Sequence, residues 1–210
     1  MKISCLMVGP LEANCYLLAD EAGEAAVIVD PGGDADLIVE HCENEGLEPV
    51  AIVCTHAHAD HIAGVPALKE RYPEAALCIG EADAETLADP VRNLTAMLGE
   101  SARMPSADRR LAEGDAVEFG ACRLRVLHTP GHTQGGICLA AEGQQPPVVL
   151  CGDLVFAAGV GRTDLPGGDW DALRRSIREK IFALPDDTVL LPGHGPATTV
   201  GGEKQSGFPL

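Results

Sequence analysis

The chain has 210 residues, 46% of them hydrophobic, and a net charge of −17 at pH 7. The hydrophobic content excludes a disordered chain, and the length predicts a single domain over residues 1–210. Acidity and an aromatic content of only 3% argue against a nucleic-acid partner, because phosphates would be repelled and few rings could stack on bases. No apolar run approaches the roughly 18 residues of a membrane span, so no membrane association is expected.

The first half of the chain alternates apolar runs with helical patterns. Asp34 can cap a helix that Gly46 would end. The stretch from Glu81 to Arg110 is predicted to be helical and irregular. The strands predicted in this half are Asn14–Ala19, Ala25–Val29 and Val50–Cys54. A further helix is expected to follow the third of them and to run as far as about Tyr72.

The second half repeats this order of strands followed by a helix. An amphipathic helix is predicted at Asp169–Phe182. Two sheets packed on each other with helices outside would cover both sheets, although the order alone leaves a doubly wound sheet open. The strands predicted in this half are Ala116–Phe119, Cys122–Leu127, Gly136–Ala140, Pro147–Cys151 and Thr188–Leu191.

Eight cysteines are present without a C-x-x-C pair, and most lie in apolar stretches, as Cys54 and Cys151 do. This pattern is typical of buried free thiols in a reducing compartment. Pro10 and Glu12 interrupt the N-terminal region and make it a poor signal peptide. The chain is therefore expected in the cytoplasm.

A dense group of potential metal ligands, His56-x-His58-x-Asp60-His61, follows the strand that ends at Cys54. Residues two apart in an extended segment point to the same side, so His56 and His58 can bind one ion. Asp60 and His61 would enter the next helix facing away from that pair and could reach a second ion. Three imidazoles and a carboxylate this close in sequence would pack badly without a metal.

Three more potential ligands stand in loops that follow predicted strands: His132, Asp153 and His194. Imidazole and carboxylate ligands suit zinc, iron or manganese. Two metals about 3.5–4 Å apart, sharing a carboxylate and a water, would use the whole set. The two remaining histidines are given structural roles, because His41 lies on a polar helix face and His128 has no carboxylate partner nearby in sequence.

The segment Thr55–His61 resembles the T-H-x-H-x-D-H signature of the metallo-β-lactamase-fold superfamily. The resemblance continues through Thr129–Thr133, Gly152-Asp153 and Pro192–Gly195, so it extends over nearly the whole chain. It implies an α/β fold, the four-layer αβ/βα sandwich with two mixed sheets, helices outside and metals at one edge between the sheets. It also implies two zinc ions, with iron or manganese as alternatives, held by His56, His58 and His132 on the first ion, Asp60, His61 and His194 on the second, and Asp153 bridging both.

Within the superfamily, Gly152–Ala157 and Gly161–Gly168 are similar to short, single-domain relatives of glyoxalase II, the hydroxyacylglutathione hydrolases. This resemblance implies cleavage of a small-molecule thioester, S-2-hydroxyacylglutathione such as S-lactoylglutathione, by a hydroxide bridging the metals. Asp60 and Asp153 would orient that nucleophile, and Asp60 could accept a proton. The helical C-terminal substrate domain of full-length glyoxalase II is not expected here.

Arg162 is the candidate substrate-binding residue, since its guanidinium could hold a substrate carboxylate. The alternative role for Arg162 is an ion pair with Asp164 that shapes the loop.

Other functions stay open on the sequence. Gly161–Asp164 also resembles iron-dependent glutathione persulfide dioxygenases, which would use His56, His132 and Asp153 for one iron. A hydrolase of the same fold acting on another ester or thioester is a further alternative, and a non-catalytic metal-binding protein is the reading from a different class. True β-lactamases commonly carry Cys where this chain has Asp153, which argues against antibiotic degradation. The sequence does not predict an oligomeric state.

Overall fold

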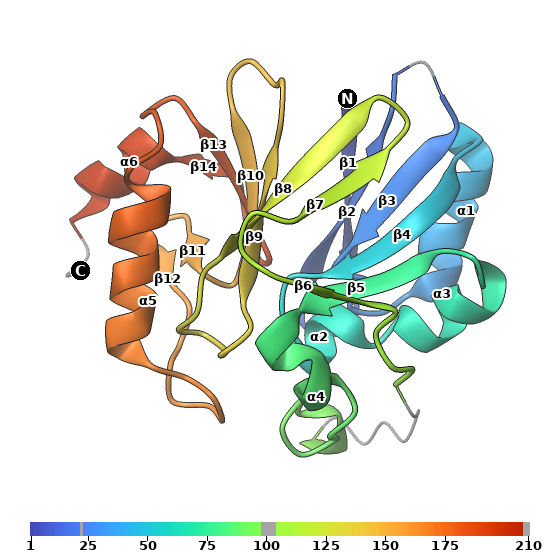
Figure 1. Ribbon diagram of the computed structural model, residues 1–210, viewed down its shortest axis with the longest axis horizontal. Helices are drawn as coiled ribbons and strands as arrows, with labels where there is room; N and C mark the ends of the chain where they lie inside the picture. The colour runs from blue at the N-terminus through green and yellow to red at the C-terminus, as the bar shows by residue number, and fades with distance from the viewer. Residues whose placement is uncertain (22, 98–103, 208–210) are drawn as a thin grey trace.

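The computed structural model describes the chain except for residues 22, 98–103 and 208–210. Two six-stranded sheets face each other, and helices cover the outer face of each sheet (Figure 1). This arrangement confirms the predicted α/β sandwich of two mixed sheets with helices outside. Across the described residues, no helix has the length and apolar character needed to span a bilayer.

The first sheet has the order β1-β2-β3-β4-β5-β6. The first three strands pair antiparallel, and β3 to β6 run parallel. Parallel neighbours end at the same edge of a sheet, so the residues that follow β3, β4 and β5 are brought close together. The strands are β1 (Lys2–Val8), β2 (Ala13–Ala19), β3 (Ala25–Val29), β4 (Glu48–Cys54), β5 (Ala76–Gly80) and β6 (Arg109–Leu111).

The second sheet has the order β14-β13-β10-β9-β8-β7, in which only the described pair β10–β13 is parallel. A small hairpin, β11 (Val155–Phe156) and β12 (Gly159–Val160), stands beside it. The strands of the large sheet are β7 (Ala116–Phe119), β8 (Cys122–His128), β9 (Ile137–Ala141), β10 (Val148–Gly152), β13 (Val189–Pro192) and β14 (Thr198–Thr199).

The described helices are mostly short. On the outside of the first sheet lie α1 and α3, and on the outside of the second lie α5 and α6 (Figure 1). Their bounds are α1 (Ala35–Glu45), α2 (Ala59–Ile62), α3 (Val65–Arg71), α4 (Ala84–Leu87), α5 (Trp170–Ser176) and α6 (Val200–Ser206), with 3₁₀ turns at Glu81–Asp83 and Thr95–Met97 and a π-helical continuation at Ile177–Ile181.

Three apolar layers hold the sandwich together, because successive side chains of a strand point to opposite faces. On β4, Val53 packs between the two sheets, whereas Ile52 and Cys54 pack under the helices of the first sheet. On β8, Val126 faces the other sheet and Leu127 packs in the layer under α5. Strands covered on both faces explain why the sequence shows continuous apolar runs rather than alternation.

Several predicted elements differ in detail. The expected helix to Tyr72 is broken into α2 and α3, and Pro66 lies in the first turn of α3, where its missing N–H costs no bond. Gly46 ends α1 in a left-handed conformation as predicted, but the Asp34 side chain makes no capping bond and accepts the Gly9 N–H at 2.8 Å instead. β5 and α6 were not predicted.

The prediction for Glu81–Arg110 is only partly right. The described residues form short helical turns near its start, and the segment ends in strand β6, which extends the first sheet. Residues 98–103 of this prediction lie outside the described part of the chain. Pairing with β5 decides the strand conformation of Arg109–Leu111, and no local pattern in the sequence reports that pairing.

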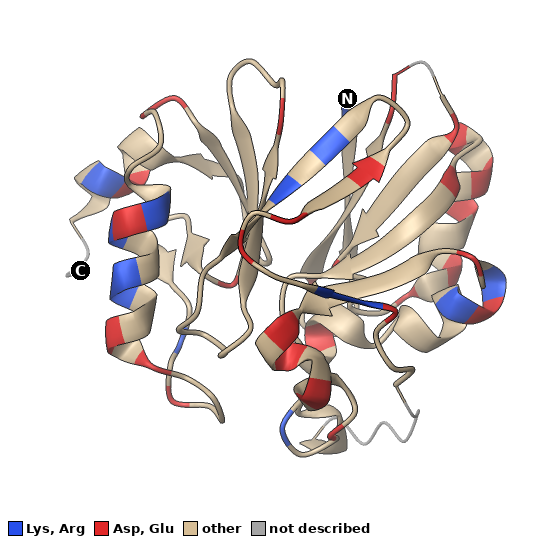
Figure 2. Ribbon diagram, viewed as in Figure 1, with Lys and Arg blue, Asp and Glu red and all other residues tan. Residues whose placement is uncertain are grey.

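Charged side chains are interspersed over the molecule. Figure 2 shows Lys and Arg on β6, β8, α3, α5 and α6, with acidic residues between or beside them. In this view the basic residues do not merge into one continuous face of the described chain.

A close backbone contact joins the two halves, and it makes a stability prediction. A Cβ on Gly80 would lie 1.9 Å from the carbonyl oxygen of Gly135. Gly80→Ala should therefore lower the free energy of unfolding by about 1–3 kcal/mol, as overpacked sites do. Urea unfolding measures the change. Gly159→Ala is the control, because its nearest neighbour would be 4.0 Å away at Phe156, and an equal loss in both variants would contradict the steric argument.

Candidate metal centre

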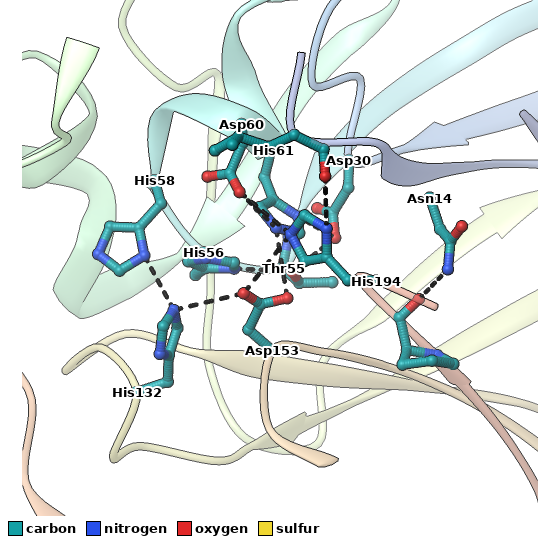
Figure 3. Close-up of polar contacts among 12 residues, drawn as sticks. Asn14, Asp30, Thr55, His56, His58, Asp60, His61, His132, Asp153 and His194 are labelled. Carbon is teal, nitrogen blue, oxygen red and sulfur yellow. Dashed lines mark hydrogen bonds and ion pairs between the residues drawn. The ribbon is translucent and has the colours of Figure 1, made fainter. Parts of the chain in front are cut away.

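All seven predicted ligands meet at the edge where the parallel strands of the first sheet end (Figure 3). Residues 55–58 leave the end of β4 and lead into α2, which carries Asp60 and His61. The second sheet supplies the other three ligands from loops: His132 lies between β8 and β9, Asp153 follows β10, and His194 follows β13.

One ligand group consists of His56, His58 and His132, whose nitrogen atoms lie within 4.8 Å of one another. The Nδ1 atom of His58 is 2.9 Å from Nε2 of His132. All three side chains are buried. The group combines two residues from the first sheet's edge with one from the second sheet, so packing of the halves completes it.

A second ligand group consists of Asp60, His61 and His194, again within 4.8 Å. His194 Nε2 lies 3.1 Å from Asp60 Oδ2, and His61 Nε2 lies 3.8 Å from the same oxygen. His61 is fully buried, whereas Asp60 and His194 are partly exposed. This group therefore lies closer to solvent than the first.

Asp153 stands between the two groups. Its Oδ1 is 3.3 Å from His61 Nε2, and its Oδ2 is 3.7 Å from His132 Nε2 and 3.8 Å from His194 Nε2. A carboxylate that faces both groups has the position that a bridging ligand requires.

The donor set fits divalent metal ions. His56 Nε2 is buried and has no hydrogen-bond partner among the described residues. His61 Nε2 and Asp153 Oδ1 are also buried, and although they lie 3.3 Å apart, neither makes a hydrogen bond there. Leaving such atoms unpaired costs about 1–3 kcal/mol each. Cations at these positions would satisfy all three, and imidazole nitrogen with carboxylate oxygen suits zinc, iron or manganese.

Protonation also favours ligation at the first group. Burial, together with repulsion from neighbouring imidazoles, holds the pKa of His56 well below its ordinary value. Burial and the nearby His132 lower the pKa of His58 to about 4. Both rings are therefore neutral at pH 7, the form in which imidazole binds a metal.

The second group behaves differently without a cation. The hydrogen bond to Asp60 raises the pKa of His194. Burial alone would raise the pKa of Asp60, but the neighbouring His194 and His61 outweigh burial and lower the Asp60 pKa below its ordinary value. Burial also opposes charge on His61, yet Asp153 and Asp30 together raise its pKa well above the usual value. A metal entering here must displace protons, so its binding should release them.

Asp30 and Thr55 orient two of the imidazoles. Asp30 Oδ2 lies 3.0 Å from His61 Nδ1 and accepts the Thr55 hydroxyl at 2.7 Å (Figure 3). The Thr55 oxygen in turn lies 3.1 Å from His56 Nδ1. Such contacts to the far ring nitrogen leave Nε2 free to face a metal. Asp30 was not predicted as a site residue, although a carboxylate directly after an apolar strand is a recognisable signal.

Backbone carbonyls hold two further ligands. His132 Nδ1 donates to the Arg162 carbonyl at 2.8 Å, and His194 Nδ1 donates to that of Leu11 at 3.1 Å. Asn14 Nδ2 donates to Pro192 and Gly195, at 3.0 and 2.8 Å, on either side of His194. Asn14 was predicted only as part of a strand, and its role depends on contacts with a segment nearly 180 positions away.

The other singled-out residues lie outside both ligand groups. His128 Nε2 is 3.0 Å from the Gln134 carbonyl, and His41 is on α1. Cys54 and Cys151 are buried in the apolar layers, and all eight cysteines, which lie in the described part of the chain, are free thiols. The Arg162 guanidinium is exposed and paired with both carboxylate oxygens of Asp164, at 2.6 and 2.8 Å.

A cavity of about 540 Å³ opens beside the second ligand group. Asp60 and His194 reach into it, and its other walls are mainly apolar, from Leu11, Phe156 and Pro196. The partly exposed ligands are therefore accessible to a small molecule.

The model of the Metallo-beta-lactamase superfamily matches residues 8–194, and the chain belongs to this superfamily. It is 38% identical to the probable metallo-hydrolase YqgX of Bacillus subtilis, over 95% of this chain and 93% of that protein. It is 34% identical to the hydroxyacylglutathione hydrolase GloC of Haemophilus influenzae, over 98% and 96% of the two chains.

Solved structures are similar over nearly the full length. The crystal structure of the BLEG-1 B3 metallo-β-lactamase has a TM-score of 0.89 and 36% identity, with 96% of each chain covered. TTHA1623 in a di-iron-bound form has a TM-score of 0.85 and 34% identity over 97% of this chain and 98% of that one. ETHE1 from Myxococcus xanthus has a TM-score of 0.80 and 28% identity, over 98% and 83%.

The position of Asp153 predicts its contribution to metal binding. Asp153→Ala should lower the metal content per chain and abolish activity. It removes the negative carboxylate between the two ligand groups, so two cations there would be less compensated in charge. His128→Ala is the control and should keep the wild-type metal content, since His128 touches neither group. Elemental analysis after equilibration with zinc measures both variants. Full metal content and normal turnover in Asp153→Ala would show that the ligand assignment is wrong.

Proposed function

We propose that this chain is a dinuclear metal-dependent hydrolase that cleaves thioesters, with S-2-hydroxyacylglutathione such as S-lactoylglutathione as its substrate. Two zinc ions would be its cofactors, with iron or manganese as alternatives. His56, His58 and His132 would hold one ion, Asp60, His61 and His194 the other, and Asp153 both. The enzyme would act in the cytoplasm, which is consistent with its free thiols, on a small molecule and without nucleic-acid or membrane partners.

The observation that carries this proposal is the pair of ligand groups that meet at one carboxylate beside a cavity. A single ion would leave three of the converging ligands unused. Two bound ions would supply Lewis acidity and lower the pKa of a water molecule.

The chain's own residues have distinct tasks in this reaction. Asp60 lines the cavity, so its carboxylate can orient an attacking water and take up a proton. Asp153, largely buried, can orient the same water. The mainly apolar cavity wall offers a contact surface for the carbon part of a small substrate. No Ser or Cys nucleophile is required.

The similarity to GloC, over nearly the full length of both chains, supports the hydroxyacylglutathione substrate. Arg162 is proposed to bind a substrate carboxylate. Its bonds to Asp164 engage Nε and Nη2, and a substrate could be held through Nη1. The Arg162 carbonyl contacts His132, so this loop is joined to the metal centre.

A second candidate is the iron-dependent oxidation of glutathione persulfide, which would use only His56, His132 and Asp153. The similarity to TTHA1623, whose structure is in a di-iron-bound form, is the observation that supports iron as an alternative metal. A third is hydrolysis of another ester or thioester by the same residues.

One comparison of substrates separates these functions. Protein loaded separately with zinc and with iron(II) should cleave S-lactoylglutathione, releasing thiol without oxygen uptake. Two metals per chain are expected by elemental analysis. Oxygen consumption with glutathione persulfide, with one iron per chain, would instead establish the dioxygenase. Simple thioesters and a β-lactam serve as further substrates, and a marked preference for either would replace the proposed substrate.

The role of Arg162 is tested by truncation. One charge-assisted hydrogen bond contributes about 1.5–3 kcal/mol, so Arg162→Ala should lower kcat/KM roughly ten- to a hundredfold. The loss should fall mostly on KM, because the contact is remote from the scissile carbonyl. Arg71→Ala is the matched control, an exposed arginine paired with Glu43 at 2.8 Å. An unchanged KM would assign Arg162 to loop structure alone.

A further inference from the structure

Asp83 is a buried carboxylate that belongs to neither ligand group. It follows β5 by three residues, so it lies in the same row of strand ends as Asp30 after β3 and His56 after β4. Only 1% of its surface is exposed. It lies in the stretch that was predicted to be helical and irregular, and no role was predicted for it.

Its two oxygens contact both loops that build the first ligand group. Oδ2 accepts the backbone N–H of Ala57, between His56 and His58, at 3.3 Å and the hydroxyl of Thr133 at 2.7 Å. Oδ1 accepts the N–H of Gly135 at 2.9 Å. Ala57 belongs to the first half of the chain, and Thr133, next to His132, belongs to the second. Asp83 therefore links the two loops.

The surrounding backbone leaves little freedom. A Cβ on Gly135 would lie 2.2 Å from the Asp83 nitrogen, and one on Gly80 would lie 1.9 Å from the Gly135 carbonyl oxygen. Glycine at both positions allows the loop that carries His132 to rest directly on the segment that carries Asp83. The contact is a close fit of main chains rather than a flexible side-chain contact.

The three groups that donate to Asp83 are all uncharged. Burying a carboxylate is costly unless charge or hydrogen bonds compensate it. The hydrogen bonds fill that role locally, and a cation held by the adjacent imidazoles would compensate the charge further.

We propose that Asp83 is a positioning residue that locks the His56–His58 loop against the His132 loop and so sets the geometry of the first metal position. Within the described part of the chain, Asp83 makes no hydrogen bond or ion pair with Asp60, His61 or His194. The orientation of His61 depends on Asp30, and that of His194 on the Leu11 carbonyl. Loss of the Asp83 carboxylate should weaken the first position and spare the second.

The test isolates each position by removing a ligand from the other. His194→Ala leaves the first group intact, and His58→Ala leaves the second. Zinc affinity is measured by competition with a chromophoric chelator, and the cobalt(II) absorption spectrum reports the geometry. Asp83→Asn is added to each background. The asparagine keeps the size of the side chain, but its NH₂ group replaces one acceptor oxygen and therefore faces a hydrogen-bond donor.

In the His194→Ala background, Asp83→Asn should lower zinc affinity about 10–100-fold, the usual cost of losing an outer hydrogen-bond partner, and change the cobalt spectrum. In the His58→Ala background, affinity should change less than about threefold, within the ordinary scatter of such values. Thr133→Val should reproduce the selective loss, and Thr133→Ser, which keeps the hydroxyl, should restore wild-type affinity. These two variants keep the test informative if Asp83→Asn does not fold.

Asp108→Asn is the control, because the Asp108 carboxylate also accepts a backbone N–H, that of Leu77 on β5 at 2.8 Å, but belongs to neither loop that carries the first ligand group. It should leave both affinities unchanged. Equal losses at both positions, no loss at the first, or the same loss from Asp108→Asn would overturn the assignment, as would absence of zinc binding by the wild type. The readout involves no substrate, so failure of the proposed thioesterase activity is a separate result.

Discussion

Five imidazoles and two carboxylates share one small volume at the edge of the sandwich, and this crowding governs the rest of the structure. Buried polar atoms are stable only when they are paired, and five nitrogen and oxygen atoms of these seven side chains make no hydrogen bond among the described residues. Without a metal, the cost of burying these groups is limited by neutral rings at His56 and His58 and by charged imidazole–carboxylate pairs at the second group. Divalent cations would lower this cost further, because they bind nitrogen and oxygen atoms together.

The fold holds these polar side chains close together, although their burial and the repulsion between imidazoles oppose it. Parallel pairing in the first sheet places Asp30, His56 and Asp83 at one edge. Neither ligand group is complete within that sheet, since His132 and His194 come from the second one. The apolar layer between the sheets therefore determines ligand geometry as much as the ligands' own loops do.

The two positions differ in their surroundings. The first is buried and is held by Thr55 through His56, by the Arg162 carbonyl through His132 and, in our proposal, by Asp83. The second opens on the cavity, and Asp60 is partly exposed there. A buried position suits a tightly held ion, and an open one suits exchange of water and substrate. This asymmetry supports the proposed hydrolysis at a dinuclear centre.

The seven candidate ligands and the sandwich were both predicted from the sequence. A cluster such as His56–His61 is a local signal, and the resemblance to the superfamily favoured the sandwich over the doubly wound sheet that the order of elements left open. The supporting residues could not be predicted. Asp83 lies in a segment without a clear local pattern, Asn14 acts on a loop far along the chain, and β6 becomes a strand only by pairing with β5. Arg162 was singled out from the sequence, with substrate binding and an ion pair with Asp164 as alternative roles. The structure shows the pairing with Asp164. Residue type determines which atoms can bind a metal, whereas the packing of two sheets decides how those atoms are held, since contacts such as Asp30–His61 and Asp83–Thr133 join segments distant in sequence.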